Sequence, residues 1–164
     1  MRDIASPPKP AAIWCPHVTV ACVVADAGRF LLVEEAIQGE LRLNQPAGHL
    51  EPNETLQQAA LRETLEESGW DVALEHFIGV TEWHSPVHDH HMVRFGFAAR
   101  PLRQHAERRL DTGIVRALWL TYPEILAARA RLRSTLVLTA IEDWLAGQRL
   151  PLATLRSLLP AAGA

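Results

Sequence analysis

The stretch GHLEPNETLQQAALRETLEESGW, residues 48–70, gathers carboxylates where a helix is expected. Glu63, Glu66 and Glu67 stand at positions i, i+3 and i+4, so a helix projects all three from one side within a single turn. Carboxylates this close repel one another. A structural or chemical reason is therefore needed for their position.

The helix itself is predicted from about residue 53 to 68. Asn53 and Thr55 are both suitable N-caps, because their short polar side chains can accept a hydrogen bond from the first turn. Gly69 follows the last helical residue and is placed to end the helix in a left-handed conformation.

An apolar stripe runs into the acidic cluster. Leu56, Ala59 and Ala60 lie on the same side as the carboxylates, and Leu61 and Leu65 lie opposite, which predicts a helix covered from two directions. Carboxylates in such a partly enclosed place raise one another's pKa unless a cation lies between them. Hard oxygen ligands without accompanying Cys or His suit Mg²⁺ or Mn²⁺ better than zinc.

A plainer alternative is a solvated helix face. Glu-rich helices often carry weak surface ion pairs between residues four apart, and Arg62 with Glu66 would be such a pair.

Outward from this segment, the chain alternates strand and helix patterns. Strands are predicted at 17–26, 29–36, 77–83, 92–100 and 114–120, with a short strand that starts near residue 41 and breaks at Pro46. Helices are predicted at 122–130 and 132–147, the second amphipathic through Leu136, Ala140, Ile141 and Trp144. This order favours an α+β fold with a mixed central sheet and helices on both faces.

With 164 residues, the chain is most simply one domain. Residues 1–13, which contain Pro7, Pro8 and Pro10, are predicted to be a mobile leader, residues 14–153 the domain, and residues 154–164 a C-terminal tail.

Composition excludes several classes of function. The formal charge of -3 gives no basic footprint, so no nucleic-acid partner is expected. No apolar run is long enough to span a bilayer, and residues 1–14 lack the apolar core of a signal peptide. The two cysteines, Cys15 and Cys22, fit a reducing compartment better than a disulfide framework, so a cytoplasmic location is expected.

The spacing of the acidic stretch resembles the Nudix box. The matching residues are Gly48, Glu54, Arg62, Glu63, Glu66, Glu67 and Gly69. Thr64 departs from the pattern, because the family usually has an aliphatic residue there. The resemblance implies the Nudix fold, an α/β/α sandwich, and a hydrolase of phosphoric anhydrides.

Further segments resemble the NudJ branch of Nudix phosphatases. They are PHVTVACVV, FLLVEE, NQPAGHLE, HFIGV, RFGFA, RLRSTLV and GQRLPL, which together cover roughly residues 16–152. This branch implies removal of phosphate from nucleoside di- and triphosphates and from thiamine-type pyrophosphates. The implied partner is a small phosphoanhydride, and the implied cofactor is Mg²⁺, with Mn²⁺ as a substitute.

By the same resemblance, Glu63 and Glu67 are the main metal ligands. Glu66 and the backbone carbonyl near Gly48 complete the set, and Arg62 orients the carboxylates. Glu54 and Gly69 are expected in supporting roles, with Gly69 most simply a helix stop.

The general base stays open. Many Nudix enzymes use a late acidic residue in a loop, and here Gly113 occupies its expected position. Asp111 is the nearest acid and Glu107 the next, while Glu63 or Glu66 could activate the water instead.

Candidate substrate contacts lie outside the box. Trp83 could stack on a base, or it could pack in the core. Gln45 and His49 could touch phosphate, with ordinary loop hydrogen bonding as the alternative. The HSPVHDHH segment, 84–91, is expected to be a polar loop that faces the substrate, and metal binding by its histidines is a weaker alternative. Those histidines are His84, His88, His90 and His91.

Two rival functions remain at this stage. One is a Nudix pyrophosphatase of another specificity, such as ADP-ribose or dinucleotide polyphosphates. The other is a domain that binds a nucleotide without catalysis, which the retention of every box carboxylate disfavours.

Overall fold

A computed structural model of the chain describes residues 13–86 and 89–159, and the sequence predictions for residues 1–12 and 160–164 lie outside these ranges. The strands are β1 (His17–Asp26), β2 (Arg29–Ile37), β3 (Glu40–Asn44), β4 (Ala47–His49), β5 (Trp70–Ser85), β6 (His90–Gln104) and β7 (Ile114–Thr121). The helices are α1 (Leu56–Ser68), α2 (Tyr122–Ala127) and α3 (Leu136–Leu145), with short 3₁₀ turns η1 (Arg129–Arg131) and η2 (Leu152–Thr154).

Strand β1 is central to the sheet topology. It pairs in parallel with β6 and antiparallel with β4, and β5 completes that side as the antiparallel partner of β6. Strand β2 pairs antiparallel with both β3 and β7. The two sets of strands meet where the ends of β1 and β2 form a hairpin. The mixed sheet predicted from the sequence is therefore confirmed.

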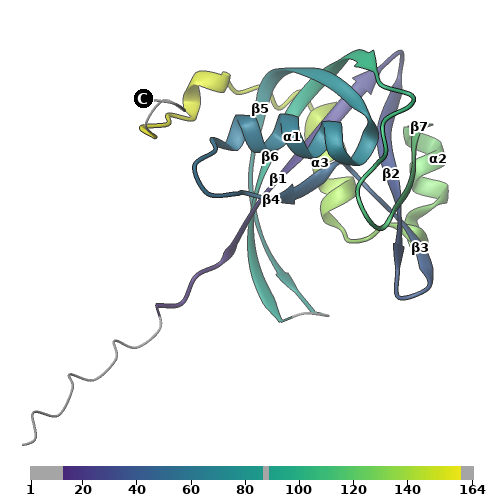
Figure 1. Cartoon of the computed structure of the whole chain (residues 1–164), viewed down its shortest axis with the longest axis horizontal. Helices are drawn as coiled ribbons and strands as arrows, with labels where there is room; N and C mark the ends of the chain where they lie inside the picture. The colour runs from purple at the N-terminus through teal and green to yellow at the C-terminus, as the bar shows by residue number, and fades with distance from the viewer. Residues whose placement is uncertain (1–12, 87–88, 160–164) are drawn as a thin grey trace, which may run out of the picture.

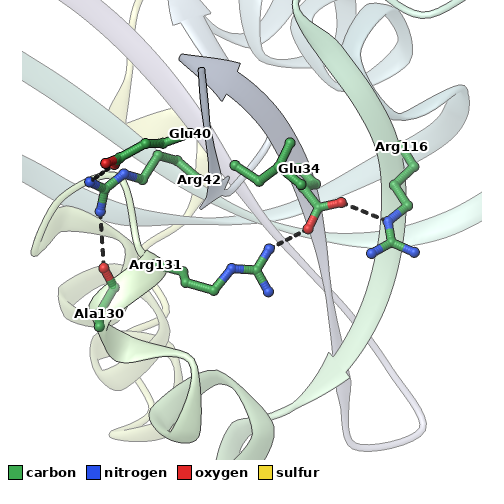
Figure 2. Close-up of a pocket in the computed structure, with 7 residues that line it drawn as sticks. Glu34, Glu40, Arg42, Arg116, Ala130 and Arg131 are labelled. Carbon is green, nitrogen blue, oxygen red and sulfur yellow. Dashed lines mark hydrogen bonds and ion pairs between the residues drawn. The ribbon is translucent and has the colours of Figure 1, made fainter. Parts of the chain in front are cut away.

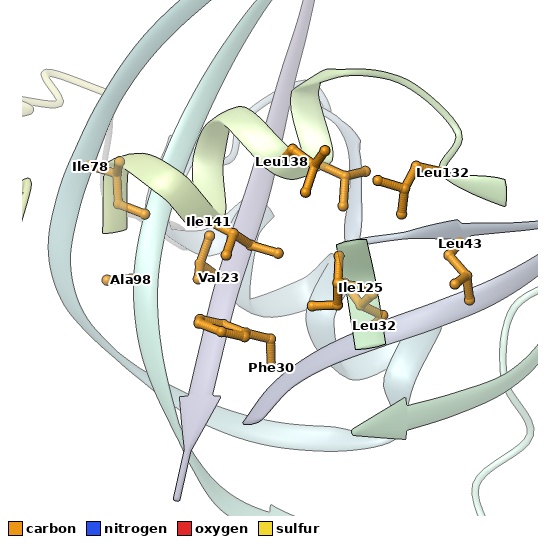
Figure 3. Close-up of a cluster of buried hydrophobic side chains, with 11 residues drawn as sticks. Val23, Phe30, Leu32, Leu43, Ile78, Ala98, Ile125, Leu132, Leu138 and Ile141 are labelled. Atoms are coloured by element: carbon orange, nitrogen blue, oxygen red, sulfur yellow. The ribbon is translucent and has the colours of Figure 1, made fainter. Parts of the chain in front are cut away.

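Two apolar cores lie on opposite faces of the strands. Helix α1, drawn in front of the strands in Figure 1, covers one core, to which β1 contributes Val20, Cys22 and Val24. Helices α2 and α3 cover the other, which contains Val23 of β1, Ile125 of α2 and Ile141 of α3 (Figure 3). Because successive side chains of a strand point to opposite faces, one strand supplies both cores. The α/β/α arrangement is confirmed.

Helix α1 starts later than the earliest predicted residue. Thr55 is the N-cap, and its hydroxyl accepts a hydrogen bond from the Gln58 backbone N–H at 3.1 Å, while Asn53 sits in the preceding turn with φ of 68°. Gly69 ends the helix with φ of 70°, as predicted. The prediction that the helix is covered on two sides was wrong, because Leu61, on the side opposite the carboxylates, is 39% exposed to solvent.

The strands around the His-rich segment are longer than predicted. β5 continues to Ser85 and β6 begins at His90, so the connection is a hairpin turn rather than a loop over 84–91. His84, His90 and His91 are strand residues, and His88 lies outside the described ranges. The sequence HSPVHDHH shows no alternation of apolar and polar residues, and this is why a loop was predicted there.

The C-terminal helices are shorter than predicted. The helix predicted over 122–130 ends at Ala127 and gives way to η1, and α3 occupies only the middle of 132–147. Beyond the predicted domain boundary, Leu155 still packs against the core under α1. None of the helices within the described ranges combines the length and apolar character needed to cross a bilayer.

Candidate active site

Gly48 lets the carboxylate of Glu63 approach the backbone of β4. A Cβ atom built on Gly48 would lie 2.1 Å from the Glu63 carboxyl carbon, far inside any real contact. The Glu63 carboxylate therefore occupies the space that a side chain at position 48 would fill, and a glycine leaves that space open.

Arg62 organises the carboxylates on its side of the helix. Its guanidinium donates to both oxygens of Glu54, at 3.0 and 2.6 Å, to Glu63 Oε1 at 2.8 Å and to Glu66 Oε2 at 3.2 Å. A further bond to the His49 carbonyl, at 3.0 Å, ties the helix to the end of β4. These hydrogen bonds hold the pKa of Glu54 below its usual value.

This network contradicts the solvated-face alternative. The side chains of Glu54 and Glu63 are only 15% and 12% exposed, so the pairs are partly enclosed rather than free in water. Burial raises the pKa of Glu63 despite the adjacent guanidinium, and the charges of Glu66 and Asp111 raise it further. The environment of Glu63 therefore disfavours the ionised form of its carboxyl group.

Glu67 is the more deeply placed carboxylate. Its Oε2 accepts a hydrogen bond from the Ala47 backbone N–H at 2.8 Å. Burial raises the pKa of this carboxyl to about 8, and the negative charges of Glu35 and Glu63 act in the same direction. The carboxyl is therefore poised to ionise when a cation comes within reach.

The donor set fits a divalent cation of the hard type. Within residues 13–86 and 89–159, no three acidic, imidazole or thiol groups already converge at metal-ligand distance. Glu63 and Glu66 are turned to Arg62, while Glu67 is turned to the β4 backbone. Like charges without a cation between them repel one another and separate. Oxygen ligands of this kind match Mg²⁺ or Mn²⁺.

Asp111 lies beside the C-terminal turn of α1. Its backbone N–H donates to the Glu66 carbonyl at 3.1 Å, and its charge contributes to the raised pKa of Glu63. Gly113 is fixed by a hydrogen bond from the Ala36 N–H to its carbonyl at 2.8 Å and has φ of 93°. Asp111 is thus the acid that this loop brings to the cluster, whereas Glu107 is exposed and forms no hydrogen bond or ion pair with the described residues of the cluster.

The predicted substrate contacts differ in their placement. Gln45 is 1% exposed, and its amide donates to the Val137 carbonyl at 3.1 Å, so this side chain lies in the interior. His49 is exposed at the border of the site, and its Nε2 atom lies 3.1 Å from Nδ1 of His17. Desolvation of the ring, followed by the charge of His17, lowers the pKa of His49. Trp83 is half-buried on β5, opposite Met92 of β6.

The sequence interpretation missed a second group of buried charged residues that interact electrostatically with Glu67. Glu35 of β2 is buried and bonded to the Asn44 amide at 2.9 Å and to Arg133. Arg94 of β6 is also buried, 9% exposed. Each of these two residues occupies an inward-facing position of a predicted strand. A charged residue at such a position is a signal in the sequence, because charged side chains are seldom buried without a specific partner.

A separate cavity lies away from the carboxylate cluster (Figure 2). It measures about 650 Å³ and is lined by Glu34, Glu40, Leu41, Arg42, Arg116, Ala130 and Arg131. The buried Glu34 carboxylate accepts from Arg116 at 2.8 Å and from Arg131, which lowers its pKa. No glutamate of α1 lines this cavity. Because Glu34 and Glu35 are neighbours on one strand, they face opposite ways.

Comparison with known proteins agrees with this geometry. Residues 16–139 match the NUDIX domain family. Phosphatase NudJ of Escherichia coli (strain K12) is 45% identical over 137 residues, which are 84% of this chain and 88% of the relative.

Solved structures give the same result. A NUDIX hydrolase from Nitrosomonas europaea superposes with a TM-score of 0.85 at 44% identity, covering 87% of this chain and 97% of that one. A bifunctional NMN adenylyltransferase/ADP ribose pyrophosphatase from Francisella tularensis, complexed with AMP and Mn ion, shares the fold alone. Its TM-score is 0.63 at 20% identity, over 83% of this chain and 43% of the other. The chain belongs to the NUDIX family and is a Nudix hydrolase.

Proposed function

We propose that this Nudix hydrolase removes phosphate from nucleoside di- and triphosphates and from thiamine-type pyrophosphates, and that it depends on Mg²⁺, with Mn²⁺ as a substitute. The observation that carries the proposal is the enclosed carboxylate cluster around Gly48, in which the Glu67 carboxyl has its pKa raised to about 8. The 45% identity to Phosphatase NudJ supports release of a terminal phosphate.

Glu63, Glu66 and Glu67, with the Gly48 backbone carbonyl, would hold the cation. A divalent cation held there would supply positive charge to the phosphate oxygens and lower the pKa of the attacking water. Arg62 positions Glu63 and Glu66 through the hydrogen bonds already described.

The supporting residues act through these groups. Glu54 fixes Arg62 by accepting two hydrogen bonds, and Gly69 ends the helix directly after the cluster. Asp111 takes the proton from the attacking water in this scheme, with Glu63 or Glu66 as the alternative acceptor.

The organic part of the substrate must be recognised outside the box. Trp83 offers a stacking surface on β5, and His49 borders the carboxylates. The free thiols Cys15 and Cys22 fit a reducing, cytoplasmic compartment.

Removal of the metal tests the proposal. Orthophosphate release from nucleoside triphosphates should stop in EDTA and return with Mg²⁺ or Mn²⁺. Glu67→Gln should lose about 10²-fold or more in kcat because it removes a charged ligand without changing the shape of the side chain. Undiminished turnover in EDTA would refute the metal dependence, and pyrophosphate as the product, or a sharp preference for ADP-ribose, would refute the proposed specificity.

A further inference from the structure

Arg94 has fewer hydrogen bonds than a buried guanidinium requires. The residue is 9% exposed, and its best contact is a long one of 3.4 Å, from Nε to Thr19 Oγ1. Its Nη1 is buried and has no partner among the described residues. Burial of a charge without pairing is costly, and proteins retain such groups where a ligand completes the pairing.

The charges around Arg94 come from three separate elements. Arg133, from the segment before α3, and Glu35 and Glu67, from β2 and α1, all act electrostatically on the Arg94 guanidinium. Glu35 already accepts a hydrogen bond from Arg133. When Glu67 is committed to a cation, two guanidiniums face a single carboxylate, and the balance of charge favours an anion.

The strand register connects this position to the rest of the site. Arg94 pairs with Thr19 of β1, and Thr19 pairs with His49 at the border of the carboxylate cluster. On the other side Arg94 pairs with Thr81, two residues before Trp83. Residues paired across strands, and residues two apart, share a face of the sheet. Arg94 therefore lies between His49 and Trp83 on one face of the sheet.

We propose that Arg94, supported by Arg133, binds a phosphate group of the substrate beside Glu67. This inference rests on the proposed function, since it names the group that the same site grips. Phosphate fits better than an uncharged ring because its oxygens accept two parallel hydrogen bonds from one guanidinium. Such a contact fixes the phosphate chain relative to the carboxylate cluster, while Trp83 remains available for the organic part.

The substitution Arg94→Met tests the contact with probes that separate phosphate from the organic part. Methylenediphosphonate carries two phosphonates, no hydrolysable bond and no ring. We expect Arg94→Met to raise both the KM for a nucleoside triphosphate and the Ki of methylenediphosphonate by about tenfold or more, because charge-assisted hydrogen bonds are lost. Inhibition by the free nucleoside should be unchanged. Calorimetric titration with methylenediphosphonate should show the same weakening without turnover.

Matched variants separate binding from a general loss of structure. Arg100→Met makes the same change on the same strand at an exposed residue that lies 3.6 Å from Glu75, and it should leave KM and Ki unchanged. Arg94→Lys should recover part of the affinity, because it restores charge without the planar fork. Arg133→Met removes the second guanidinium, which is half-exposed, and it keeps the test valid if Arg94→Met folds poorly. This variant should also raise the Ki of methylenediphosphonate.

Two results would overturn the inference. Unchanged KM and Ki in both Arg94→Met and Arg133→Met would show that neither guanidinium binds phosphate. A raised KM with an unchanged Ki for methylenediphosphonate would assign Arg94 to the organic part of the substrate. Both results require an active wild-type enzyme, so they are distinct from failure of the proposed function, in which the wild type itself releases no phosphate.

Discussion

The absence of a Cβ atom at Gly48 determines where the Glu63 carboxyl group can lie. The missing Cβ leaves room for the Glu63 carboxyl group, which lies 2.1 Å from where that atom would be. The clashing atoms are the far end of a flexible side chain. An added methyl group would therefore displace the carboxylate and leave the backbone in place.

Gly48→Ala should accordingly lower kcat by about 10²-fold with little change in Tm, since the carboxylate is displaced from its position. Steady-state kinetics and thermal unfolding of the same sample measure the two effects. Gly79→Ala is the control, because a Cβ at Gly79 would meet nothing within 4 Å. A large fall in Tm with normal activity in Gly48→Ala would contradict the steric explanation.

The Glu67 carboxyl links stability to pH in the metal-free protein. Its pKa is raised from 4.5 to about 8 in the folded state. Between these two values the folded state keeps the proton that the unfolded state has lost. The free energy of unfolding therefore falls as pH rises through this window, and the contribution is complete only below about pH 4.5.

Glu67→Gln removes this titration. In EDTA, the Tm of the variant should exceed that of the wild type by more at pH 8 than at pH 5, with each ~1 kcal/mol worth ~2–4 °C in a chain of this size. Calorimetric scans across the pH range provide the measurement. Parallel curves for the two proteins would show that Glu67 titrates normally in the folded state.

At the scale of elements, α1 combines a buried face with a charged one. Ala59, Ala60 and Thr64 are buried against the strands, and the carboxylates emerge beside them. The Thr64 hydroxyl donates to the Ala60 carbonyl at 2.7 Å, which satisfies a polar group at a position that is usually aliphatic in the family. The helix start is fixed by the reciprocal bonds of Thr55 and Gln58.

Thr55→Ala should lower the free energy of unfolding by ~1 kcal/mol, because the first turn loses its side-chain acceptor. The expected fall in Tm is ~2–4 °C. Thr135→Ala is the matched control, since Thr135 precedes α3 without a capping side-chain hydrogen bond. Equal shifts in the two variants would contradict the importance of the cap.

At the scale of the whole molecule, the site is assembled from distant segments. The loop after β6 delivers Asp111 to α1, with its N–H 3.1 Å from the Glu66 carbonyl, although 45 residues separate them in sequence (111 − 66). This contact makes Asp111 a better candidate for the proton acceptor than Glu107, which lies on the same loop but has no such contact with α1.

Asp111→Asn should lower kcat by about 10²-fold or more, because it eliminates a proton acceptor. Glu107→Gln should leave kcat unchanged. If both variants behave alike, the proton acceptor is Glu63 or Glu66, and the loop acid has an auxiliary function.

The sequence by itself determined α1, its Gly69 end, the carboxylate spacing and the mixed sheet. These features depend on local periodicity and on a fixed motif, which a linear pattern records directly. The spacing alone left the partly enclosed site and a solvated surface as alternatives, and the low exposure of Glu54 and Glu63 decided for enclosure.

The tertiary structure decided what the linear pattern could not contain. Gln45 lies in the interior because α3 packs over it, and the His-rich segment is a hairpin because β5 and β6 pair to its end. The parallel pairing of β1 with β6 places Arg94 opposite Thr19, within the electrostatic reach of Glu67. The physical reason is that the pKa of a buried charge and the partners of a buried polar group depend on segments far away in sequence, whereas helix periodicity and motif spacing depend on near neighbours.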